Sequence, residues 1–104
     1  MDWQTKKSRR LLQAILTLKT NSEAKRFFRD LMTRKEIEEF SNRFRAAEML
    51  AANMPYVEIE QETGLSSTTV ARVAKWLRGE AGGYRTVLEK LHHHNSIQSR
   101  RGLS

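Results

Sequence analysis

One window of this sequence gathers short hydroxyl side chains and cations without any carboxylate between them. No acidic residue occurs between Glu62 and Glu80, so a bound anion would meet no local repulsion there. Hydroxyl and cationic groups donate hydrogen bonds to phosphate oxygens and to the edges of bases. The window therefore favours contact with a nucleic acid. The side chains that carry this prediction are Ser66, Ser67, Thr68, Arg72 and Lys75.

Other kinds of site find little support in the residue types. The chain has no cysteine, which excludes disulfides, thiolate metal sites and a cysteine nucleophile. The three histidines of the run 92–94 are adjacent, and neighbours on a helix point in different directions, so they cannot converge on one ion. No hydroxyl nucleophile stands beside a plausible base, and no glycine-rich phosphate loop occurs. We predict no enzyme, no metal site and no cofactor.

Length and charge narrow the class of protein further. The 104 residues are enough for one domain, and 19 basic against 12 acidic residues give a net charge of +7, which favours a polyanionic partner. The first residues are followed by a charged segment and not by the apolar stretch of a signal peptide. No apolar stretch is long enough to cross a bilayer. We expect a cytoplasmic protein without a membrane partner.

The spacing of apolar residues predicts an all-α fold with about six helices. One proline and five glycines leave few breaks, and the apolar residues recur at helical rather than strand intervals. The first helix should run from about 3 to 18. Thr20-x-x-Glu23 and Thr33-x-x-Glu36 have the pattern of capping boxes, so helices should begin at both places. The second of these should continue to about Asn53.

Two short helices should follow, joined by a tight turn. Met54-Pro55 must break the preceding helix, because the residue before a proline avoids α geometry. Residues 56–63 form the next helix, Gly64 ends it, and Ser66 or Ser67 caps the one after. Two short helices with a glycine turn are typical of a helix-turn-helix, here about 55–78. The apolar residues expected to hold the two helices together are Ile59, Leu65, Val70 and Val73.

The two ends of the chain give weaker signals. A last amphipathic helix is expected over about 84–93, followed by a disordered tail over 95–104. The basic run of Lys6, Lys7, Arg9 and Arg10 is either a solvated helix face, the preferred interpretation, or an arm that touches phosphates. Trp3 and Trp76 are expected to be packing residues.

Several of these segments, in this order, resemble the tryptophan-repressor superfamily and specifically its YerC/YecD branch. The resemblance covers about residues 10–92. It rests on Phe27-Phe28-Arg29-Asp30-Leu31, on Glu36-Ile37 through Arg43, on Ala47-x-Met49-Leu50, and on Tyr56-x-x-Ile59-Glu60-x-Glu62-Thr63-Gly64-x-Ser66-x-x-Thr69-Val70-x-Arg72-Val73.

The resemblance implies an intertwined helical homodimer that binds double-stranded DNA and regulates transcription, as a repressor. Residues 1–94 would form one domain, with dimerisation helices at about 3–53 and 84–93 and the helix-turn-helix as reading head. The main alternative is a helical protein-interaction module that uses the same helix pair; RNA binding ranks behind both, because few aromatics are available for stacking. The expected DNA-binding residues are Tyr56, Ser66, Ser67, Thr68, Thr69, Arg72 and Lys75.

The resemblance also bears on a small-molecule effector. In the tryptophan repressor, an arginine from each of two helices holds the indole, and Arg43 and Arg72 match those positions. The position where that repressor has a glycine is Val73 here, and its side chain would occupy the space of the indole. We therefore expect no tryptophan corepressor, and the effector pocket of Arg43, Arg72 and Val73 to be filled.

Overall fold

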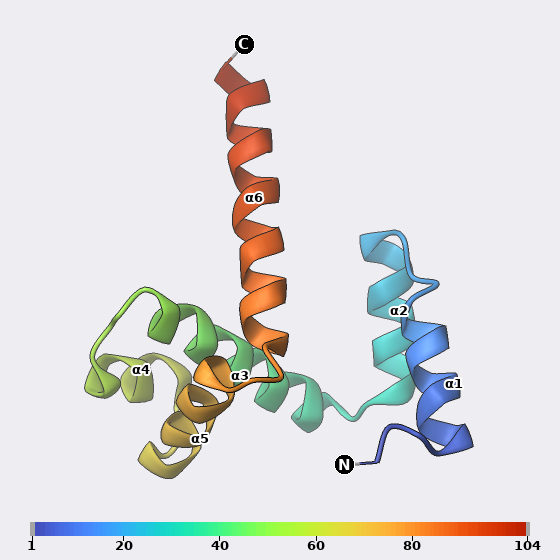
Figure 1. Ribbon diagram of the computed structural model, residues 1–104, viewed down its shortest axis with the longest axis horizontal. Coiled ribbons are helices and arrows are strands. Elements are labelled where there is room, and N and C mark those ends of the chain that lie inside the picture. Colours follow the sequence, from blue (N-terminus) through green and yellow to red (C-terminus); the bar gives the residue numbers. More distant parts are fainter. Residues whose placement is uncertain (1, 104) are drawn as a thin grey trace. The chain divides into compact units, whose positions relative to one another are not determined.

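The computed structural model describes the backbone of residues 2–103 and the side chains of residues 2–93. This part of the chain contains six helices and no strand (Figure 1), which confirms the predicted all-α class. By its internal contacts the chain divides into two compact units, Met1–Ile37 and Glu38–Ser104. The helices are α1 (Lys6–Ile15), α2 (Asn21–Leu31), α3 (Arg34–Ala51), α4 (Tyr56–Thr63), α5 (Ser67–Arg78) and α6 (Gly83–Leu103).

The N-terminal unit consists of α1, α2 and the start of α3. Neither α1 nor α2 contains a buried residue, although both have strongly one-sided apolar faces. The rings of Phe27 and Phe28 meet edge to face at 5.6 Å. Helix α1 is shorter than the predicted 3–18, because Thr5 caps its start by accepting from the Ser8 backbone N–H at 3.2 Å, and Leu16 is its C-cap residue.

Both predicted capping boxes mark helix starts, but only the second is complete. Thr20 Oγ1 accepts from the Glu23 N–H at 3.1 Å. At α3 the bonds are reciprocal: Thr33 Oγ1 accepts from the Glu36 N–H at 3.1 Å, and Glu36 Oε1 accepts from the Thr33 N–H at 3.0 Å. The hydrogen bonds to the carboxylate from the backbone and then the side chain of Thr33 lower the pKa of Glu36 below its ordinary 4.5. The charged carboxylate therefore stabilises this helix start at neutral pH, and the contribution is lost as the pH falls through the lowered pKa.

Helix α3 ends in a left-handed turn that redirects the chain into α4. Asn53 has a φ of 60°, and the Met54 N–H donates to the Met49 carbonyl at 3.0 Å while the Asn53 N–H donates to the Leu50 carbonyl at 3.0 Å. This is the Schellman arrangement, which satisfies carbonyls that the helix leaves without partners. Pro55 then takes an extended conformation as the N-cap of α4. The break predicted at Met54-Pro55 is confirmed.

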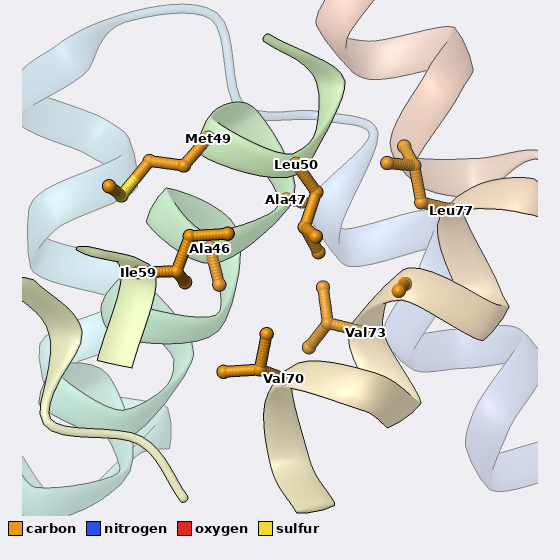
Figure 2. Packing of buried hydrophobic residues seen from close by; sticks show 9 residues of the cluster. Ala46, Ala47, Met49, Leu50, Ile59, Val70, Val73 and Leu77 are labelled. Atoms are coloured by element: carbon orange, nitrogen blue, oxygen red, sulfur yellow. The ribbon is translucent and has the colours of Figure 1, made fainter. Parts of the chain in front are cut away.

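The core of the second unit lies where α3, α4 and α5 meet, as Figure 2 shows. Helix α3 contributes two small and two large residues to this core. Helix α6 contributes Tyr84 and Leu88, which pack against this core while partly exposed. The buried apolar residues are Ala46, Ala47, Met49, Leu50, Ile59, Val70, Val73, Ala74 and Leu77.

Gly64 ends α4 in the left-handed region, with φ 71° and ψ 6°. A Cβ atom at this position would meet no neighbour within 4 Å, so the glycine is required by its backbone conformation and not by space. We expect Gly64→Ala to lower the free energy of unfolding by about 1–2 kcal/mol, the cost of placing a side chain in this region. Urea unfolding measures the change. Gly83→Ala, where a Cβ also meets open space and φ is not positive, is the matched control; equal effects would contradict the explanation.

The end of α6 differs from expectation. The sequence predicted a helix over about 84–93 and a disordered tail over 95–104, whereas the backbone is helical through Leu103 and Ser104 lies outside the described residues. No proline or glycine occurs between Gly83 and Gly102, so no residue in this stretch forces the helix to stop. In the part of the chain that the structure describes, no helix is both long and apolar enough to span a bilayer.

Candidate DNA interface

The second short helix, α5, is anchored by one face and open on the other. Ile59 of α4 and Val70 and Val73 of α5 are fully buried, and Figure 2 shows them turned toward α3. Leu65, in the turn, is half-buried against the same cluster. The four residues predicted to hold the two helices together therefore do so. Since α5 has 3.6 residues per turn, burial of 70, 73, 74 and 77 places 68, 72 and 75 on the opposite side. Ser67, the first residue of α5, lies beside the buried face and is exposed at the N-terminal end of the helix.

The turn between α4 and α5 is held by side-chain bonds that the sequence pattern did not reveal. Thr63, a buried polar residue, donates from Oγ1 to the Ile59 carbonyl at 2.7 Å and accepts from the Leu65 N–H at 3.3 Å. Ser66 is the N-cap of α5, and its Oγ accepts from the Thr69 N–H at 3.2 Å. These bonds fix the angle at which α5 leaves the turn. The helix presented to solvent is thus rigidly attached to the core.

The predicted contact residues divide into two groups by their hydrogen bonds. The hydroxyl groups of Ser66 and Thr69 are hydrogen-bonded to each other, with their oxygens 3.0 Å apart. These two side chains are therefore engaged in capping the start of α5. The other residues are exposed, and Tyr56, at the start of α4, is 39% exposed. Within the described residues their side chains make no hydrogen bond or ion pair inside the chain, which leaves their polar groups available to a ligand. This group contains Tyr56, Ser67, Thr68, Arg72 and Lys75.

Arg45 of α3 forms ion pairs with two glutamates. Arg45 Nε donates to Glu62 Oε1 at 2.9 Å, and Arg45 Nη1 lies 3.8 Å from Glu48 Oε1. The bond to Glu62 raises the pKa of Arg45 above its already high ordinary value. The pair is half exposed, so it contributes little stability. Its consequence is electrostatic: the last glutamate before the acid-free window is held by a cation on another helix.

The three residues of the predicted effector pocket have different surroundings. Val73 is fully buried inside the core. Arg43 is engaged on its own helix, where Nη2 donates to Glu39 Oε1 at 2.8 Å and the guanidinium lies 5.7 Å from the centre of the Phe40 ring. Its Nε is buried without a partner in the described chain. Arg72 is exposed on α5.

A cavity of about 750 Å³ lies at the junction of α5 with α6, and Lys75 of the outward face is among the residues that line it. Trp76, Phe44, Tyr84 and Val87 give it a largely apolar lining. Trp76 is 48% exposed and Trp3 is 47% exposed, although the sequence predicted that both would be packed. Neither indole therefore finds enough partners within one chain to be covered.

The described chain is all-α, and its α4–α5 pair has the arrangement of a helix-turn-helix, with α5 anchored on one face and exposed on the other. These features define a protein of the helix-turn-helix class. The family model described as Trp repressor protein matches residues 6–92. The chain belongs to this family, whose members are DNA-binding regulators. The predicted resemblance to the tryptophan-repressor superfamily is confirmed.

Individual relatives agree with this assignment. The chain is 38% identical over 81 residues to the uncharacterized protein YerC of Bacillus subtilis (strain 168), covering 78% of each chain. The crystal structure of a TrpR-like protein from Eubacterium eligens has a TM-score of 0.80 and 41% identity, covering 86% of this chain and 93% of that one. A crystal structure from Staphylococcus aureus has a TM-score of 0.81 and 34% identity, covering 88% and 95%.

Proposed function

We propose that this protein is a transcriptional regulator, a repressor, that binds double-stranded DNA in a sequence-specific manner as a homodimer. One observation carries the proposal: α5 presents exposed hydroxyls at its N-terminal end and cations further along, while its opposite face is fully buried. In helix-turn-helix proteins the second helix enters the major groove, with its N-terminal residues toward the bases. Ser67 and Thr68 occupy those positions, and Arg72 and Lys75 follow one and two turns later. We propose no enzymatic activity.

The homodimer is proposed because one chain leaves too much apolar surface uncovered. Helices α1 and α2 have no buried residue, and the buried core contains only residues of α3, α4 and α5. Sharing a core with a second copy gives a chain of this size the burial that it lacks alone. In such a dimer, the first three helices and α6 of each chain interlock, so that residues 1–94 form one domain. Light scattering tests the dimer directly.

Selection of binding sites from random duplexes tests the function. We expect a roughly two-fold symmetric site whose halves lie about one helical turn, 34–36 Å, apart. Binding should weaken steeply as salt rises, because each neutralised phosphate releases about one counterion. If the helix pair docks on a protein instead, no sequence will be enriched, and any binding to duplex will be indifferent to sequence. Either outcome decides between the two functions.

We also propose that tryptophan is not a corepressor, because Val73 fills the space that an indole would need. Opening an apolar site that is already packed costs about 1–3 kcal/mol, as overpacked cores show. Calorimetric titration with L-tryptophan is therefore expected to give no saturable heat, with L-leucine as the control for nonspecific effects. DNA affinity should also be the same with and without tryptophan. Saturable binding at micromolar concentrations would contradict the proposal.

A further inference from the structure

The excess positive charge of this protein lies almost entirely in its N-terminal unit. Residues 1–37 contain ten lysines and arginines against four acidic residues, a net charge of +6. Residues 38–104, which include the helix-turn-helix, contain nine against eight, a net charge of +1. The attraction of the chain for a polyanion therefore comes mainly from a part of the molecule outside the reading head.

Most of these cations are exposed and lack a carboxylate partner. Eight of the ten lie on α1, on α2 or in the connection between them, and all eight are exposed. Within the described residues none of the eight forms an ion pair. We name them the N-terminal basic surface: Lys6, Lys7, Arg9, Arg10, Lys19, Lys25, Arg26 and Arg29.

On each helix the cations share a face. Lys6, Arg9 and Arg10 of α1 follow one another at three and four residues, and with Gln4 and Gln13 they line a polar hollow of about 280 Å³. No acidic residue lines this hollow.

Helix α2 repeats the arrangement. Lys25, Arg26 and Arg29 line a second hollow, of about 480 Å³, with Asn21 and Ser22 and again without a carboxylate. Arg26 Nε donates to the Ser22 carbonyl at 3.3 Å, which holds this side chain along the helix. Two neighbouring helices thus each present a row of cations to solvent.

This arrangement is unfavourable for the helices themselves. The first turns of α1 contain Lys6, Lys7, Arg9 and Arg10 and no acidic residue, so positive charge sits at the positive end of the helix dipole. Like charges three and four residues apart also repel one another. A row of anions beside the helix would remove both penalties. Local electrostatics that work against the fold are expected at functional surfaces.

The apolar faces of the two helices argue for DNA over a membrane. Leu11, Ile15, Phe27 and Phe28 are half-buried, while Leu12, Leu16 and Leu31 are exposed. In the proposed dimer these apolar faces pack against the second copy, so they are not available to a bilayer. Unpaired RNA is bound largely by stacking on aromatic rings. Trp3 is the one exposed aromatic side chain among residues 2–33. A regular array of backbone phosphates is the partner that rows of cations fit.

We propose that the N-terminal basic surface binds the phosphates of duplex DNA, outside the base pairs read by α5 and independently of their sequence. The proposal rests on the proposed function, since it gives the same bound duplex a second contact. The reading head would select the site, and the N-terminal unit would supply most of the salt-dependent affinity.

Binding of the full-length chain to a labelled random-sequence duplex, followed by fluorescence anisotropy across about 50–200 mM KCl, tests this proposal. The test variants are R9Q/R10Q and R26Q/R29Q. The matched control is R85Q/K90Q, which also removes two exposed charges but on α6. The charge-retaining variants R9K/R10K and R26K/R29K, with circular dichroism of each protein, separate charge from folding.

Each lost phosphate contact is expected to reduce the slope of log K against log salt by about 0.9, and to weaken binding roughly eightfold at 0.1 M salt. The lysine variants and the α6 control should keep the wild-type slope. A wild-type slope in both glutamine variants overturns the proposal, as does an equal decrease in the control. Loss of binding to single-stranded RNA or anionic vesicles, with duplex binding intact, also overturns it.

The proposed function fails by a different result. If the wild-type protein binds no duplex, neither the function nor the second contact holds. If it prefers a selected site over random duplex and both glutamine variants keep the wild-type slope, the function holds and only the second contact is wrong.

Discussion

Arg72→Ala is expected to reduce the preference of the protein for its selected site over a random duplex by about 1–3 kcal/mol, the value of a good side-chain contact to a base. Arg72 lies on the outward face of α5, exposed and without an ion pair in the described chain, so its removal disturbs nothing in the fold. Thr68→Ala, one turn earlier, should reduce the preference in the same way. Competition binding between the two duplexes at one salt concentration measures the change.

The matched control is Arg85→Ala, which removes an exposed arginine from α6. It should leave the preference unchanged, and urea unfolding should show that Arg72→Ala is as stable as the wild type. If Arg72→Ala weakens binding to both duplexes equally, Arg72 contacts a phosphate and not a base. An unchanged affinity for both duplexes would contradict the placement of α5 in the groove.

Ile59→Ala is expected to lower the free energy of unfolding by about 2–5 kcal/mol, the range observed when a large apolar core residue is truncated. Ile59 is fully buried and joins α4 to the cluster formed with α3 and α5. Its loss leaves a cavity where α4 packs against the core. Urea unfolding measures the effect. The protein concentration is kept fixed, because the stability of a dimer depends on it.

Val57→Ala provides the control on the same helix. Val57 is 62% exposed, so its truncation should change the stability by no more than about 0.5 kcal/mol. Similar effects of the two substitutions would mean that the α4 to α5 contact is not the anchor described above. The Ile59→Ala protein that remains folded should still prefer its selected site, because its α5 face is unaltered.

Local signals in the sequence were sufficient to place the reading head. Pro55 cannot continue a helix, Gly64 adopts a φ that other residues avoid, and Ser66 caps the next helix, so each boundary depends on neighbouring residues only. The apolar period then determines which side of α5 is buried. For the same reason the outward face of Thr68, Arg72 and Lys75 could be predicted before any tertiary contact was known.

Pairings between distant residues could not be predicted in this way. Arg45 and Glu62 lie 17 positions apart, and only the packing of α3 on α4 brings their side chains within 2.9 Å. The length of α6 was underestimated, because a polar sequence without helix breakers carries no signal for its end. The lack of ion pairs among the basic residues of α1 and α2 could not be predicted either, since it is a property of the folded chain.

The sequence alone thus determined the all-α class, the helix boundaries at Pro55 and Gly64, and the polar face of α5, because each follows from backbone preference or helical period. The tertiary structure decided how deeply Val73 is buried, which carboxylate Arg45 holds, and that the exposed cations gather in a unit separate from the reading head. These properties depend on which helices meet in space. An amphipathic pattern predicts that one face of a helix is covered, but it does not predict which other element covers that face.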